Sequence, residues 1–240
     1  MKTSKIINAV KNSIFPKDIK CIACGEDLFN ENKYYLCEKC LNEIEFCDKV
    51  CLKCGNVIRD ESDYCMSCLR DINKPYEKAF APLIYKGKVV DMVHMLKYHS
   101  AKWIANYLAN FMVDEFKKQN IEVDVVVPIP LSEKRYKERE YNQAELLARC
   151  FCEKLNLELD TNNLIRLKHT ETQTKLNFNE RKENILGSFS IVDKNAFKNK
   201  NILVIDDVFT TGATMGEACQ TISNCKPNKI YCLTLAHVEL

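Results

Sequence analysis

The chain has 240 residues, of which 28% are charged and 46% hydrophobic, and its formal net charge is +2. This length can bury a core in one or two domains, and the balanced charge excludes overall basicity as an argument for nucleic-acid binding. The first residues lack the apolar core of a signal peptide, and no window approaches the roughly 18 consecutive apolar residues of a membrane helix. We therefore expect a cytoplasmic protein without membrane insertion, whose fourteen cysteines stay reduced.

Eight of these cysteines form four CxxC pairs near the N-terminus. The pairs are Cys21 and Cys24, Cys37 and Cys40, Cys51 and Cys54, and Cys65 and Cys68. A CxxC turn directs two thiolates to a shared Zn²⁺, and two such turns complete a tetrahedral site. The spacing predicts a double zinc ribbon over residues 17–70 with two structural zinc ions, whose binding supplies the folding energy of this short segment.

Two questions about the ribbon stay open at this point. Sequential pairing of the four turns is simpler than an interleaved cross-brace, but spacing alone permits both. A disulfide-stapled module is the alternative to zinc, and it would need an oxidising compartment. Residues 17–70 hold eight Lys and Arg against eleven Asp and Glu, so we interpret the ribbon as a scaffold or protein-contact module. Cys47 and the five later cysteines lack ligand spacing and are expected to pack in the interior.

After a short connector, residues 76–240 show the pattern of an α/β domain. Strands are predicted where apolar β-branched runs occur, and helices where apolar residues recur at helical spacing. The predicted strands lie at 80–84, 123–130, 201–208 and 229–238, and the predicted helices at 89–99, 102–119, 142–157 and 215–225. Alternating strands and helices imply an open parallel sheet flanked by helices, with ligands at the carboxyl ends of the strands.

The most informative segment is residues 202–215, which read ILVIDDVFTTGATM. An apolar strand delivers Asp206 and Asp207 to its carboxyl end, and a loop of Thr and Gly then opens a helix. Backbone N–H groups and Thr hydroxyls at a helix N-terminus can hold a phosphate monoester. Two carboxylates one loop away suit the hydroxyls of a ribose, directly or through Mg²⁺. A plain strand–turn–helix with an acidic cap is the alternative.

Two basic segments accompany this loop. After the strand ending at Pro130, four cations follow within nine residues, which suits a pyrophosphate group but also an ordinary solvated loop. Residues 164–182 carry five Lys and Arg against two Glu, as a basic flap over an active site or a surface loop would.

The segment 202–215 closely resembles the phosphoribosyl pyrophosphate (PRPP) binding motif of type I phosphoribosyltransferases. The resemblance implies catalytic carboxylates at Asp206 and Asp207 and a Mg²⁺ ion bound with PRPP. It implies a 5-phosphate cradle at Thr210, Thr211, Gly212, Ala213 and Thr214, and we assign Arg135 and Arg139 to the pyrophosphate. The fold is then a type I phosphoribosyltransferase-like parallel sheet, preceded by the ribbon.

Nearly the whole chain resembles the ComF family. The resemblance rests on the double ribbon, Lys97 in LKYH, VPIPLSEKRYKEREYNQAELLA, RLKHTETQTKLNFNERKENILGSF and ILVIDDVFTTGATM. It implies a link to DNA uptake in natural transformation. Family members commonly have Arg-Gly-Phe-Asn-Gln where this chain has Arg139-Glu140-Tyr141-Asn142-Gln143. Glu140 disfavours a positive φ and places an anion beside the pyrophosphate segment.

Three functional hypotheses follow. The first is a phosphoribosyltransferase that acts on PRPP and an unidentified nitrogen nucleophile. The second is a non-enzymatic, PRPP-responsive adaptor that binds single-stranded DNA beside a DNA-uptake helicase or channel protein. In that case, residues 131–149 and 164–182 would follow the phosphates, and Tyr136, Tyr141 and Phe178 would stack on bases. The third is a nucleobase-salvage phosphoribosyltransferase, which the ribbons make less favoured.

Overall fold

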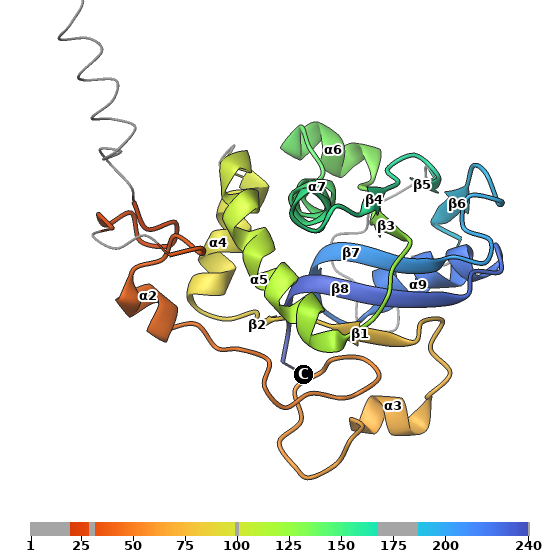
Figure 1. Ribbon diagram of the computed structural model, residues 1–240, viewed down its shortest axis with the longest axis horizontal. Coiled ribbons are helices and arrows are strands. Elements are labelled where there is room, and N and C mark those ends of the chain that lie inside the picture. The colour runs from red at the N-terminus through yellow and green to blue at the C-terminus, as the bar shows by residue number, and fades with distance from the viewer. Residues whose placement is uncertain (1–19, 29–31, 99–100, 168–186, 240) are drawn as a thin grey trace, which may run out of the picture.

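The computed structural model describes residues 20–28, 32–98, 101–167 and 187–239. Its centre is a six-stranded parallel sheet in the order β1-β8-β7-β3-β4, with β2 also paired to β8 (Figure 1). The strands of this sheet are β1 (Lys78–Phe80), β2 (Leu83–Ile84), β3 (Val125–Pro128), β4 (Glu158–Leu159), β7 (Asn201–Phe209) and β8 (Lys229–His237). A separate antiparallel hairpin joins β5 (Leu164–Arg166) and β6 (Phe189–Ile191).

The described helices lie mostly between these strands. They are α2 (Glu38–Asn42), α3 (Met66–Arg70), α4 (Lys88–Tyr98), the 3₁₀ turn η1 (Lys102–Ile104), α5 (Ala105–Gln119), α6 (Glu133–Arg139), α7 (Gln143–Leu155) and α9 (Ala213–Ser223). The predicted α/β fold, a parallel sheet flanked by helices, is confirmed. The predicted helix at 102–119 is present, but its first turn is 3₁₀.

The two longest strands, β7 and β8, form the middle of the sheet. They run in register from Asn201 opposite Lys229 to Phe209 opposite His237. Ile202–Ile205 are fully buried because successive side chains of a strand enter the two faces alternately, and helices cover both faces. Leu203 and Ile205 pack with α4, α5 and α7, whereas Ile202 and Val204 pack with α9. The carboxyl ends of these central strands therefore meet at one edge of the molecule.

The basic segment after β3 differs from its prediction as a loop. Residues 133–139 form helix α6, because Ser132 caps it by accepting a hydrogen bond from the Arg135 backbone N–H. The helix ends at Glu140, which adopts the left-handed conformation with φ 64°. The positive φ expected to be unfavourable is thus present, on a residue whose Cβ disfavours it. The predicted flap at 164–182 lies outside the described residues from 168 onward, and only its start, in β5, is seen.

The eight paired cysteines form two groups of four. One group is Cys21, Cys24, Cys37 and Cys40, and the other is Cys51, Cys54, Cys65 and Cys68; within each, the sulfur atoms lie within 4.8 Å of one another. The grouping is sequential along the chain, not interleaved. Both groups fit the four-thiolate sites of zinc ribbons. Gly25 and Gly55 follow their knuckles with φ of 77° and 72°, the positive values that such turns use.

In each group, the backbone favours the thiolate form of one cysteine. Burial raises the pKa of Cys21, but hydrogen bonds from the backbone N–H groups of Cys37, Ala23 and Cys24 outweigh it and lower the pKa to about 7. Cys51 behaves alike: burial raises its pKa, and the N–H groups of neighbouring residues lower it to about 7. A thiolate that accepts N–H groups is stabilised in the charged form that binds zinc.

The two ribbons dock on different parts of the sheet domain. The first packs on α5, where Tyr34 stacks on Phe111 with ring centroids 4.0 Å apart and donates its hydroxyl proton to Asp114 Oδ2 at 2.5 Å. The second packs on β1, where the carbonyl of Lys53 accepts a hydrogen bond of 2.9 Å from the Ala79 N–H. Figure 1 shows its helix α3 beside β1. The ribbons are therefore part of the same packed body as the sheet.

Metal analysis tests the two sites. We expect two zinc ions per purified chain, and one each in Cys37→Ser and Cys65→Ser, because either change removes a ligand from one group only. Elemental analysis after gel filtration measures the ratio. Cys47→Ser is the matched control and should retain both ions. Two zinc ions in either ligand variant, or a loss in the control, would contradict the assignment.

Candidate functional site

The site begins with two adjacent carboxylates at the carboxyl end of β7. Their side chains leave the strand in different directions, as expected for neighbours in a strand. Asp206 lines a small open pocket, together with Val208, Phe209, Thr210, Gly212, Thr214, Met215 and Thr234. Asp207 instead meets Lys97 from α4, with 2.6 Å between Nζ and Oδ2. Asp206 thus faces the pocket, and Asp207 forms an ion pair with Lys97.

The strand end is tied together by hydrogen bonds around the two acids. The Asp207 N–H donates to Asp206 Oδ1, and the Val208 N–H donates to Asp207 Oδ1, each at 2.8 Å. The Lys97 and Asp207 side chains are 18% and 13% exposed, so solvent screens their ion pair only weakly. Both carboxylates are therefore held in fixed orientations.

Charge is not balanced at this strand end. Burial and the charge of the neighbouring Asp207 raise the pKa of the Asp206 carboxyl to about 7, and the Asp207 backbone N–H and Lys97 oppose the rise. Among the described residues, Lys97 forms an ion pair with Asp207, and none forms one with Asp206. A second cation at Asp206 would relieve the repulsion, and carboxylate oxygens are ligands that Mg²⁺ prefers. The residues present therefore fit a magnesium ion at Asp206.

The Thr and Gly loop leads from β7 into α9. Gly212 is the N-cap with φ 75° and offers no capping side chain, while the Ala213 N–H donates to Thr211 Oγ1 at 3.4 Å. A Cβ at Gly212 would lie 2.5 Å from the ring of Phe209, so only glycine fits there. Thr210 is exposed and residues 211–214 are half-buried, beside the pocket of Asp206. Free N–H groups at a helix N-terminus favour an anion at this place.

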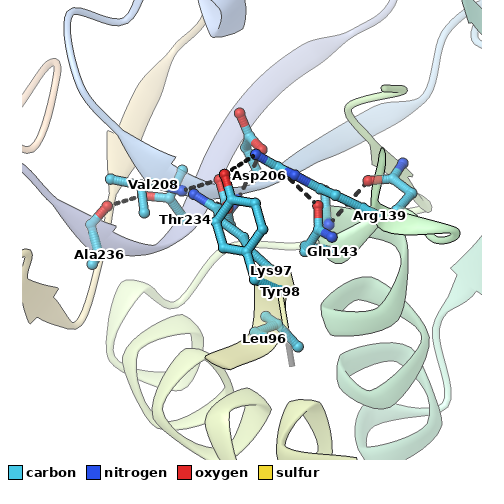
Figure 2. Close-up of polar contacts among 12 residues, drawn as sticks. Leu96, Lys97, Tyr98, Arg139, Gln143, Asp206, Val208, Thr234 and Ala236 are labelled. Carbon is cyan, nitrogen blue, oxygen red and sulfur yellow. Dashed lines mark hydrogen bonds and ion pairs between the residues drawn. The ribbon is translucent and has the colours of Figure 1, made fainter. Parts of the chain in front are cut away.

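The two arginines assigned to pyrophosphate have different surroundings. Arg139 donates from Nη1 to the side-chain oxygen of Gln143 at 2.9 Å and from Nη2 to the Tyr98 hydroxyl at 3.2 Å. Its guanidinium also lies 5.2 Å from the centroid of the Tyr98 ring. Figure 2 shows Lys97, Tyr98, Arg139 and Gln143 converging beside Asp206. Arg135 is exposed on α6.

Sequence reasoning assigned no role in the site to Lys97 or Tyr98, and it placed Arg166 only within the basic flap predicted at 164–182. Lys97 stood in a quoted motif, but nothing in the sequence pairs it with Asp207. Tyr98 stood in the same motif, but nothing in the sequence indicated its contact with Arg139. Arg166, at the end of β5, lies close enough to Asp206 and Arg135 that their charges affect its pKa, which burial lowers most.

One expectation about stacking residues is wrong. Tyr141 is 8% exposed, and its hydroxyl donates to the Leu96 carbonyl at 2.6 Å, so its ring cannot stack on a base. Its neighbour Asn142 caps α7 and donates to the Ile129 carbonyl at 2.9 Å, which fixes α7 to the end of β3. Tyr136 is 54% exposed, and Phe178 lies outside the described residues.

Among the described residues, no helix has both the length and the apolar character needed to span a bilayer.

Two family models match the chain. A double zinc ribbon domain matches residues 10–69, and a phosphoribosyl transferase domain matches residues 153–238. The second match contains the acid pair, the Thr and Gly loop and α9. It leaves α4 and α6, which supply Lys97 and Arg139, outside its bounds.

Curated relatives share this arrangement over most of the chain. Competence protein F of Haemophilus influenzae is 27% identical over 229 residues, which cover 91% of this chain and 97% of that protein. The DNA utilization protein YhgH of Salmonella typhimurium is 25% identical over 82% of this chain and 89% of its own length. Competence protein ComFC of Bacillus subtilis is 43% identical over 101 residues, 41% of this chain and 38% of that protein. The chain thus carries a double zinc ribbon domain ahead of a phosphoribosyl transferase domain, and over most of its length it is similar to proteins named for competence and DNA utilization.

Proposed function

We propose that the protein binds PRPP with Mg²⁺ and catalyses a phosphoribosyltransferase-type reaction. The observation that carries this proposal is that Asp206 and the N-terminal residues of α9 line one pocket. The pocket therefore offers a carboxylate for ribose hydroxyls or a metal at one end and an anion site at the other. A ribose 5-phosphate carries the complementary groups.

Each group of the chain then has a defined task. The N–H groups of Gly212–Thr214 and the hydroxyls of Thr210, Thr211 and Thr214 hold the 5-phosphate. Asp206 accepts from the ribose and would hold Mg²⁺, which supplies charge neutralisation of the departing pyrophosphate. Lys97 orients Asp207 through their ion pair beside the positive charge that develops on the sugar, where a carboxylate provides electrostatic stabilisation. Arg135, Arg139 and Arg166 add positive charge for the pyrophosphate.

The biological setting is also a proposal. Relatives are named for competence and DNA utilization, so we propose that this protein acts in the cytoplasm in DNA uptake during natural transformation, beside a helicase or channel protein. A nucleobase-salvage enzyme would share the same pocket and differ in its acceptor.

Pyrophosphate release tests the site. We expect the protein to release pyrophosphate from PRPP and Mg²⁺ with some nitrogen nucleophile, and Asp206→Asn/Asp207→Asn to lower the rate by about 10²-fold or more, because charge stabilisation at the reacting centre is lost. Ammonia, amines and nucleobases are the acceptors to compare.

The control is Asp91→Asn, which removes an exposed carboxylate from α4 away from the pocket and should leave the rate unchanged. Full activity of the double variant would refute the site assignment. Tight, Mg²⁺-dependent PRPP binding without release for any acceptor would favour the non-enzymatic adaptor.

A second function, binding of single-stranded DNA, has its own observation. Helix α6 has no buried residue and presents Lys134, Arg135 and Lys137 beside the exposed ring of Tyr136. Tyr98, also 54% exposed, is joined to this helix through Arg139. Cations interleaved with exposed aromatic rings suit a strand that contacts the protein through phosphates and stacked bases.

Salt dependence measures this function. We expect sequence-independent binding of a fluorescent oligonucleotide whose affinity falls with salt, and Lys134→Ala/Lys137→Ala should reduce the slope of log K against log salt by about 1.4, for two lost phosphate contacts. Lys117→Ala/Lys118→Ala on α5 is the matched control. An affinity that does not change with salt would exclude the function.

A further inference from the structure

The second ribbon reaches the phosphate loop through one buried histidine. His237, the last residue of β8, is 1% exposed. Its Nε2 lies 3.3 Å from the carbonyl oxygen of Cys54, a ligand of the second four-cysteine group, and its Nδ1 lies 2.8 Å from the Val238 carbonyl. A neutral imidazole has one N–H for these two carbonyl acceptors: protonated at Nε2 the ring donates to Cys54, and protonated at Nδ1 it donates to Val238. In either tautomer the buried ring lies against the backbone of a residue of the second four-cysteine group.

The other contact of this histidine leads to the loop. His237 pairs with Phe209 across β7 and β8, and the two rings stack with centroids 4.6 Å apart at 22°. The far edge of the Phe209 ring lies against Gly212, where a Cβ would be only 2.5 Å away. Any displacement of the Phe209 ring therefore reaches the residue that begins α9.

The knuckle itself is held firmly against the sheet. The Lys53 carbonyl accepts from the Ala79 N–H, and a Cβ at Gly55 would lie 2.7 Å from the Ala79 carbonyl oxygen. The residues on both sides of Cys54 are thus fixed to β1. The position of the Cys54 carbonyl then depends on two things, the edge of the sheet and the closed knuckle that Cys51 and Cys54 form around a metal.

Among the described residues, the first ribbon (20–28 and 32–43) has no contact with His237, Phe209 or Gly212. Its contacts are with α5, through Tyr34 on Phe111 and through Lys33 and Tyr34 at Asp114. These residues lie on the helical layer and not at the carboxyl end of β7. The two metal groups, alike in ligands, differ in their relation to the pocket.

We propose that zinc at Cys51, Cys54, Cys65 and Cys68 positions the phosphate loop through His237 and Phe209. Zinc binding at this second site and PRPP binding at the loop are then coupled, whereas the first zinc site is not. His237 is a positioning residue, since it acts on the ligand only through Phe209 and Gly212. The inference rests on the proposed function for its ligand, but the geometry of the loop can be tested without PRPP.

The first experiment measures the stability of the phosphate loop in the absence of PRPP. Hydrogen exchange of the amides of residues 213–216 is compared in the full-length wild type, Cys65→Ser and Cys37→Ser, each with its zinc content measured. We expect exchange to be about 5- to 10-fold faster in Cys65→Ser and unchanged in Cys37→Ser. Equal exchange in all three proteins, or equal acceleration by both variants, would overturn the inference.

The second experiment measures the coupling. PRPP affinity is determined by calorimetry, and zinc affinity by competition with a chelator, with and without PRPP and Mg²⁺. We expect Cys65→Ser to weaken PRPP binding about 5- to 10-fold, and PRPP to tighten zinc binding at the second site by the same factor, because coupling between binding sites is reciprocal. Cys37→Ser should leave the PRPP affinity within about twofold of the wild type, since its ribbon does not reach the loop.

Variants of the histidine separate positioning from folding. His237→Phe keeps an aromatic ring but cannot donate to Cys54, so it should retain two zinc ions and lose the effect of PRPP on zinc affinity. His237→Gln restores a donor and should recover part of the coupling. Coupling that persists in His237→Phe would overturn the role of the histidine. If the wild type does not bind PRPP, the proposed function fails, and hydrogen exchange of the loop still decides this inference.

Discussion

The site depends on one electrostatic constraint: two adjacent carboxylates stand at the half-buried carboxyl end of a central strand, and Lys97 forms an ion pair with one of them. Burial raises the pKa of Asp206, and the charge of Asp207 adds to the rise. Without a ligand, the strand end therefore carries either a proton or an unfavourable charge. A divalent cation, or a sugar on which positive charge develops, would reduce the repulsion between the two carboxylates. Carboxylates whose pKa is raised by burial and a like charge are common at functional sites.

The rest of the fold holds this arrangement in place. Pairing of β7 with β8 along nine residues brings Asp206 opposite Thr234 and Phe209 opposite His237. Helix α4 brings Lys97 to one side of the strand end, and α9 begins on the other. The second ribbon contacts the carboxyl end of β8, where His237 lies against the Cys54 carbonyl. Metal binding, sheet pairing and the ligand pocket therefore share a few neighbouring residues.

Much of the fold could be predicted because its signals are local. The buried run at 201–208 and the helical spacing at 142–157 depend on burial patterns that neighbouring residues display by themselves. The CxxC spacing indicated two zinc sites, and the sequence DDVFTTGAT indicated a carboxylate pair ahead of a phosphate loop. These motifs are contiguous, so no knowledge of packing was needed to find them.

The remaining features arise from contacts between distant segments. Lys97 and Asp207 are 110 positions apart and meet only after α4 packs beside β7. Tyr141 lies in a basic, polar segment, yet the Leu96 carbonyl accepts its hydroxyl proton inside the core. Helix α6 was missed because its charged residues have no apolar stripe, and Glu140 takes a positive φ because the chain must turn into α7. Local pattern carries no information on any of these.

The most direct measurement of the central claim is the titration of the Asp206 carboxyl by ¹³C NMR in the wild-type protein. The account predicts an apparent pKa of about 7 without ligand, so that Asp206 is protonated below that pH. Saturating Mg²⁺ and PRPP should lower this pKa, because a bound cation favours the carboxylate, and their binding should weaken as the pH falls through 7. An Asp206 pKa near the ordinary value of about 4, unchanged by Mg²⁺ and PRPP, would contradict the account.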